Sequence, residues 1–323
     1  MTGTFKANNP LNAFLLFVYG LLLKIGWFLH SNPNSNLKQP IFSKGPADFF
    51  NNFFDSHSFF GYLLAYLLVY IQAITINSLI ISRRMMAKPN YLPAMSYLLI
   101  TSLFYEWNVL SAPLISGTLL LWSFSLMTRF YNNKNGKGII FNAGLLVGIS
   151  SFVYLPAATF ILLIILALLI TRPPKAAEWV VAFLGFIIAW YFLFAWLFLS
   201  NRLYSFSLPG IKVAYPAILN NTWIYIRLIG LMVLGLAGGI FIQSSAARQV
   251  VQVRKLWTLV LLYFIVGVFT TFINPGYHIE YWIIALLPLA AFIASAFYNI
   301  GKWMALIIHW VIAGTVIYLE YFM

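Results

Sequence analysis

The sequence contains no cysteine and very little charge. Charged residues make up 8 % of the 323 residues, and only six residues are acids. Soluble domains contain about 25 % charged residues. The absence of cysteine excludes disulfides, thiolate metal sites and cysteine nucleophiles. The shortage of charge excludes the polar shell that a water-soluble fold of this length needs.

Long hydrophobic runs take the place of the missing charge, and hydrophobic residues make up 62 % of the chain. Only helices and closed barrels satisfy their backbone hydrogen bonds in lipid. The runs are continuous over roughly twenty residues, as a transmembrane helix requires, whereas barrel strands alternate over about ten residues. We therefore predict an all-α fold, a polytopic transmembrane helical bundle that forms a single domain over residues 1–323.

The apolar runs predict about eleven spans. Their approximate bounds are 11–29, 58–82, 91–105, 109–127, 139–154, 156–171, 178–199, 222–242, 257–273, 282–298 and 303–322. The segments near 91–105 and 139–171 are short or interrupted by Pro93 and Pro156, so we expect some of them to be hairpins that do not cross completely. The first run lacks a small-residue cleavage site, which favours a span over a signal peptide.

The basic residues predict the orientation. With the N-terminus in the cytoplasm and the C-terminus outside, most of the 19 basic residues fall in cytoplasmic loops, as the positive-inside rule requires. These residues are Lys6, Arg83, Arg84, Lys88, Arg129, Lys134, Lys137, Arg172, Lys175, Arg248, Arg254, Lys255 and Lys302. The outer loops contain only Lys38, Lys44, Arg202 and Lys212. Topology thus explains the net charge of +13, and we predict a bacterial inner-membrane protein with no nucleic-acid partner.

Two outer loops, 30–57 and 201–221, are long enough to carry a function. Within the first, phenylalanines recur four residues apart and polar residues share one helical face, which predicts an amphipathic interfacial helix over 46–57. Asp48 and Asp55 on its polar face are candidate general bases for a lipid-linked substrate. The alternative for Asp48 is a first-turn acid that favours the helix dipole, and for Asp55 a solvated acid.

Two cations lie inside predicted spans, at the depth of the outer leaflet. An ionisable residue in a span is a candidate functional residue, and Lys24 and Arg227 together could bind the phosphate of a polyprenyl carrier. The alternative is that both side chains extend to the headgroup layer.

Two further outer segments place a carboxylate among aromatic residues. Glu106 lies in Tyr-Glu-Trp-Asn, and Glu280 follows His278 in His-Ile-Glu-Tyr-Trp. Both segments suit sugar binding and also suit an ordinary aromatic belt. His309 lies in mid-span, where we expect it to satisfy a neighbouring helix. No metal-spaced histidine pair, Walker-type loop or Gly-x-Ser-x-Gly elbow occurs, so we predict neither a metal site nor a cofactor.

Two stretches carry a resemblance to a known architecture. Residues 144–152, Gly-Leu-Leu-Val-Gly-Ile-Ser-Ser-Phe, with Tyr154-Leu155-Pro156, and residues 278–290 resemble helices of the GT-C superfamily of integral-membrane glycosyltransferases. This resemblance implies sugar transfer from a polyprenyl-phosphate carrier at the outer face, with an acid of the first outer loop as base. Such enzymes usually carry paired acids there, whereas Asp48 and Asp55 stand apart. The whole chain also resembles an uncharacterised membrane family of Bacteroidota-type genomes.

Three functions follow from these patterns. The first is a GT-C-like protein that handles a polyprenyl-phosphate-linked sugar for envelope glycan assembly. The second is a non-catalytic scaffold that binds envelope protein partners. The third is a transporter of a small solute or lipid, for which the mid-span polar residues Gln72, Thr75 and Asn77 and the glycines Gly235, Gly238 and Gly239 are the only indications.

Overall fold

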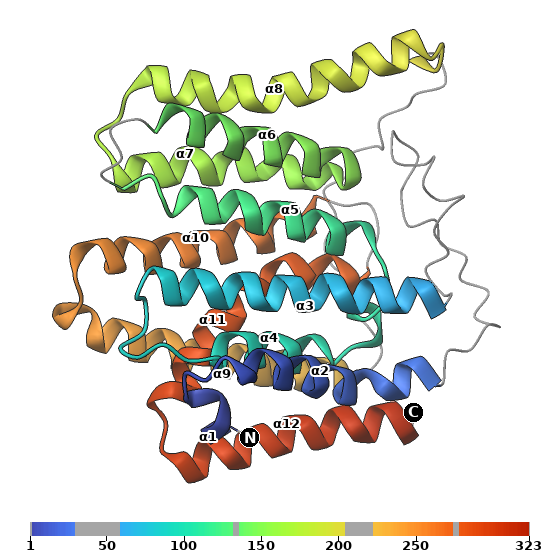
Figure 1. Cartoon of the computed structure of the whole chain (residues 1–323), viewed down its shortest axis with the longest axis vertical. Helices are drawn as coiled ribbons and strands as arrows, with labels where there is room; N and C mark the ends of the chain where they lie inside the picture. Colours follow the sequence, from blue (N-terminus) through green and yellow to red (C-terminus); the bar gives the residue numbers. More distant parts are fainter. Residues whose placement is uncertain (1, 30–58, 132–135, 204–221, 274–277, 323) are drawn as a thin grey trace.

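The computed structural model describes residues 2–29, 59–131, 136–203, 222–273 and 278–322 (Figure 1). Within these ranges the regular structure is helical throughout, which confirms the all-α prediction. Asp48, Asp55 and the predicted interfacial helix lie outside the described residues, as does most of the second predicted outer loop.

Each predicted apolar run corresponds to one helix. The helices are α1 (Thr2–Lys6), α2 (Leu11–Leu29), α3 (Phe59–Ser82), α4 (Leu92–Thr101), α5 (Ala112–Met127), α6 (Lys137–Val153), α7 (Phe160–Thr171), α8 (Ala176–Leu199), α9 (Thr222–Ser245), α10 (Val251–Phe272), α11 (Ile283–Asn299) and α12 (Lys302–Phe322). Short 3₁₀ turns join them: η2 (Tyr105–Trp107), η3 (Leu155–Thr159), η5 (Ala246–Arg248) and η6 (Ile279–Trp282). The sequence pattern did not predict α1, and α10 begins before residue 257.

The chain is a helical membrane protein. Within the described ranges, six helices are long and apolar enough to cross a membrane: Phe59–Ser82, Ala176–Leu199, Trp223–Arg248, Val251–Phe272, Ile279–Asn299 and Lys302–Leu319. The shorter apolar helices are Leu11–Gly26, Leu92–Thr101, Ala112–Met127, Lys137–Val153 and Leu155–Thr171. Large apolar side chains on α8, α9 and α12 remain exposed, so these helices contact lipid.

The long helices lie side by side with nearly parallel axes, with α8 at one margin and α12 at the other (Figure 1). The interior is formed by α4, in which every residue is buried, and by α11, which packs against α4, α5, α9 and α10. Burial explains the length of α4. Ten residues span about 15 Å, half of the hydrocarbon core, and a helix enclosed by protein need not match the bilayer thickness.

Two buried contacts explain polar residues in mid-span. The Tyr19 hydroxyl and His309 Nε2 are 3.0 Å apart, which joins α2 to α12 and confirms the expectation that His309 satisfies a neighbouring helix. Gln72 of α3 donates to the Leu114 carbonyl at 2.9 Å and to Thr118 Oγ1 at 2.8 Å on α5. Gln72 therefore has a packing role, whichever function the bundle serves.

Charge is segregated between the two ends of the bundle. The end where α3 stops and α4 starts, on the left of Figure 1, is called the basic end. At this end lie Lys6, Arg83, Arg84, Lys88, Arg129, Lys137, Arg172, Lys175, Arg248, Arg254, Lys255 and Lys302. The opposite end contains the α4–α5 link (residues 102–111), and there the described residues include only Lys24, Arg202 and Arg227 as cations.

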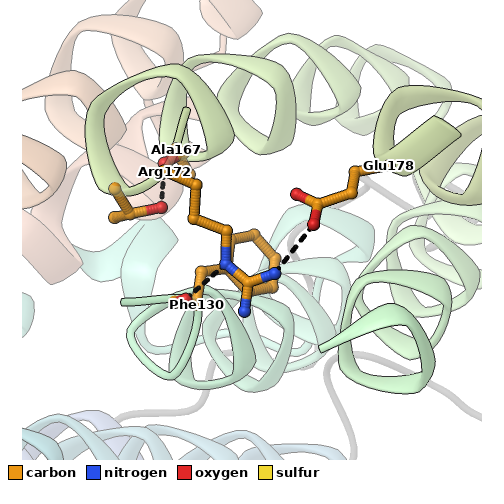
Figure 2. A network of polar contacts seen from close by, with 5 residues as sticks. Phe130, Ala167, Arg172 and Glu178 are labelled. Atoms are coloured by element: carbon orange, nitrogen blue, oxygen red, sulfur yellow. Dashed lines mark hydrogen bonds and ion pairs between the residues drawn. The ribbon is translucent and has the colours of Figure 1, made fainter. Parts of the chain in front are cut away.

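One ion pair stabilises the basic end (Figure 2). Arg172 Nη1 lies 2.9 Å from Glu178 Oε1, and both side chains are 11 % exposed. Arg172 Nε also donates to the Phe130 carbonyl at 2.5 Å, so one guanidinium joins the ends of α5 and α7 to the start of α8. Gly136 leaves room for the Arg172 guanidinium in this place, because a Cβ on residue 136 would lie 2.4 Å from an Arg172 nitrogen.

Small residues let α6 and α8 touch through their backbones. A Cβ on Gly144 would lie 2.2 Å from the Ala182 carbonyl oxygen, and one on Gly185 would lie 2.2 Å from the Phe141 oxygen. Such close approach is how membrane helices gain packing energy without a hydrophobic driving force. The glycines of the 144–152 stretch thus have a direct packing role.

Candidate functional site at the α4–α5 link

Arg227 of α9 anchors the α4–α5 link. Its Nη1 donates to the Leu103 carbonyl at 2.9 Å, and its Nε donates to the Trp223 carbonyl at 3.1 Å. The guanidinium carbon lies 4.6 Å from the centre of the Phe104 ring, within range of a cation–π contact. These contacts satisfy a half-buried cation and join α9 to the α4–α5 link.

Two carboxylates lie in the neighbouring turns η2 and η6. The buried Trp107 of η2 donates through Nε1 to the Ile279 carbonyl at 2.8 Å, and this contact packs η2 against η6. Glu106 lies within electrostatic range of Glu280 and of Arg227. The structure therefore brings together three predicted site residues that are far apart in the sequence.

Lys24 approaches the link from α2. Its side chain is only 2 % exposed, and its ammonium donates to Thr101 Oγ1 at 3.3 Å and to Asn108 Oδ1. A buried cation needs such partners because its desolvation is costly. Lys24 thus packs against the α4–α5 link.

Aromatic residues border the polar cluster. The hydroxyls of Tyr62 and Tyr105 form a hydrogen bond. Burial raises the pKa of Tyr105. The hydrogen bond with Tyr62 lowers it and the charge of Glu106 raises it, and the net shift is upward, so this phenol stays neutral. Tyr281 stacks on Tyr154 with ring centres 5.8 Å apart. The predicted site residue His278 is exposed and packs edge-on against Tyr281, at the margin of the cluster.

The sequence pattern missed Asn108 and Tyr105. Both belong to the Tyr-Glu-Trp-Asn segment, whose only predicted site residue was Glu106, because a polar residue in a turn is ordinary. The position of the whole segment between two apolar runs was a stronger indication of a functional role than any one of its residues. No group of three or more metal-ligating side chains occurs in the part of the chain that the structure describes.

Comparison with known proteins gives a family without an activity. Residues 45–323 match the family described as "Family of unknown function (DUF6427)". No curated protein and no solved structure matches the chain. Because the match covers most of the sequence, the chain belongs to this family of unknown function.

Proposed function

We propose that the chain crosses the membrane about eleven times, with the basic end in the cytoplasm and the α4–α5 link at the outer face. The six helices that are long enough to span a membrane and the five shorter apolar helices together supply the eleven segments that this topology needs. The cations of the described ranges gather at one end, as the positive-inside rule predicts for the cytoplasmic side.

Reporter fusions test this topology. Fusions after Lys88, Arg129, Arg172 and Lys255 should report the cytoplasm, and fusions within 31–45 and 203–215 should report the outside. A cytoplasmic signal from residue 210 would contradict this topology. The loop can lie in the cytoplasm only if the proposed number of spans before it is wrong by an odd number.

We propose that the outer end binds a polyprenyl-phosphate-linked sugar, in the manner of GT-C-like proteins. The observation that carries this proposal is that Glu106 lies within electrostatic range of both Glu280 and Arg227, beside aromatic rings. Carboxylates accept hydrogen bonds from sugar hydroxyls, aromatic faces stack on sugar rings, and an arginine binds phosphate. Lys24 positions the link through Asn108.

In the proposed reaction, Asp55 or Asp48 of the first outer loop accepts the proton of an acceptor hydroxyl. The acceptor oxygen then bonds to the anomeric carbon of the sugar, and the bond between that carbon and the carrier phosphate breaks. The electron pair leaves with the phosphate, whose charge Arg227 stabilises. Glu106 and Glu280 bind the sugar.

A non-catalytic scaffold is the second candidate function. It is favoured by the contacts of Arg227, which already donates to two backbone carbonyls and could serve only to anchor α9. The outer end would then bind an envelope protein partner in place of a lipid-linked sugar.

Carrier binding and complementation of a deletion strain separate these functions. With undecaprenyl phosphate as the probe, Arg227→Gln should weaken binding about tenfold to a hundredfold, because charge-assisted hydrogen bonds contribute about 1.5–3 kcal/mol. Asp55→Asn should abolish complementation and leave binding intact, since the amide keeps its shape but accepts no proton. Glu106→Gln/Glu280→Gln should weaken binding of the sugar-loaded carrier only.

Arg202→Gln is the matched control, because it removes one positive charge at the same end but lies on the α8 side of the second loop. If the Arg227 and Asp55 variants bind and complement like the wild type, the enzyme hypothesis is wrong and the scaffold replaces it. If Arg227→Gln alone has an effect, the protein binds a lipid but does not catalyse sugar transfer.

A further inference from the structure

A cavity of about 390 Å³ opens at the basic end, away from the α4–α5 link. Its walls come from the α3–α4 link, from α11 and from the junction of α9, η5 and α10. Arg84 contributes to one wall and Arg248 to another, while Met86 and Trp257 contribute apolar surface. A neighbouring cavity of the same size shares Arg84 and is also lined by Lys88. Two guanidinium groups from distant parts of the sequence thus border one space.

The positive charge of this cavity is not neutralised within the described residues. The guanidinium groups of Arg84 and Arg248 form neither an ion pair nor a hydrogen bond with the parts of the chain that the structure describes. Arg84 has a φ of 49°, in the left-handed region that residues other than glycine rarely adopt. Lys6 supplies a third charge by donating to the carbonyl of Tyr298, a lining residue, at 2.8 Å.

Polar atoms of the cavity wall indicate a ligand that carries a hydrogen-bond donor as well as an anionic group. Gln249 donates through Nε2 to Ser245 Oγ at 3.0 Å, and its Oε1 is buried without a hydrogen-bond partner among the described residues. This oxygen requires a donor, such as a hydroxyl or ammonium group. Val250 precedes the 22-residue helix α10 and provides no side-chain cap, so the first N–H groups of α10 add partial positive charge beside the arginines.

We propose that this cavity binds the headgroup of an anionic phospholipid of the phosphatidylglycerol type. Arg84 and Arg248 bind the phosphodiester, and a glycerol hydroxyl donates to Gln249. The acyl chains lie along α9, which ends at the cavity and exposes large apolar residues such as Leu236 and Ile240 to lipid. This apolar surface favours a lipid over a free phosphate, because only a lipid has acyl chains to cover it. Basic pockets between spans on the cytoplasmic side are also known to bind anionic lipid headgroups.

Native mass spectrometry of the purified protein in detergent tests the site, with dioleoylphosphatidylglycerol as the probe and dioleoylphosphatidylcholine as the neutral comparison. The double variant Arg84→Gln/Arg248→Gln should bind phosphatidylglycerol about tenfold to thirtyfold more weakly. The control Lys137→Gln/Lys175→Gln removes the same charge from exposed positions at the same end and should bind like the wild type. Equal losses in the two variants would overturn the proposal, because they would show a diffuse charge effect.

A second variant keeps every charge. Ala87 lines both cavities and is exposed, so Ala87→Trp should fill the space and weaken phosphatidylglycerol binding with no change in net charge. Melting temperatures in lipid-free detergent identify any variant that fails to fold, in which case the other variant decides. Unchanged binding in the folded variants overturns the site. Displacement of the lipid by millimolar inorganic phosphate overturns the lipid assignment in favour of a soluble anion.

Discussion

Replacing Gly238 with leucine should separate α9 from α11 and cost about 3 kcal/mol or more, at the upper end of overpacking effects. A Cβ at this position would lie 1.8 Å from the backbone oxygen of Phe292. A backbone atom cannot rotate away, so one whole helix would have to shift against the other. α11 is the buried centre of the bundle, and the shift would disturb its other contacts. Thermal unfolding in detergent measures the effect.

The adjacent glycine provides the control. A Cβ on Gly239 would have no atom of the described residues within 4 Å, although this glycine lies on the same helix one residue later. Gly239→Ala should therefore be neutral or slightly stabilising, because alanine favours a helix over glycine by about 1 kcal/mol. Equal destabilisation by Gly238→Ala and Gly239→Ala would contradict the close approach of α9 and α11.

Replacing Arg172 with methionine should lower stability by about 3 kcal/mol, because removal of one partner leaves the other charge buried and unpaired. Glu178 would lose its ion pair, and the Phe130 carbonyl would lose its donor. The double variant Arg172→Met/Glu178→Met should be more stable than Arg172→Met alone, since apolar replacement of a buried pair is often nearly neutral. Chemical unfolding of the three proteins measures the difference.

Lys175→Met controls for the loss of a cation nearby. This lysine is exposed in the same α7–α8 link, so its replacement should change stability by no more than about 0.5 kcal/mol. If the double variant is as unstable as Arg172→Met, the ion pair is not what Arg172 contributes, and its hydrogen bond to Phe130 accounts for the loss.

The helices from α2 to α12 could be predicted because each of them follows an apolar run in the sequence. Uninterrupted apolar residues mark their lengths, and charges and prolines mark their ends. α1 has no such pattern. It is fixed by tertiary contacts: Phe5 is buried, and its carbonyl accepts a hydrogen bond from the Tyr91 N–H at 2.7 Å. α10 begins at Val251, before the predicted bound of 257, because a helix can continue through charged residues such as Arg254, which is exposed.

The site could be predicted only residue by residue. Glu106, Arg227 and Glu280 were each recognisable as charges in or beside an apolar run, on the predicted outer side, but sequence spacing says nothing about which helices are neighbours. Lys24 shows the same limit, because its partner Asn108 lies 84 positions away. The cavity at Arg84 and Arg248 gave no signal of its own, since the positive-inside rule already explained every cation at that end.

The complete burial of α4 has a consequence for biogenesis. During synthesis, a segment enters the bilayer by itself when its free energy of transfer from water to lipid is favourable. A helix of ten residues is too short to meet this condition alone. α4 must therefore enter together with a neighbour, and α3 and α5, which flank it in the chain, are the first available. Its final enclosure waits for α11, which is synthesised almost two hundred residues later. The nascent chain must therefore hold α4 in a provisional environment until the last eighth of the protein emerges.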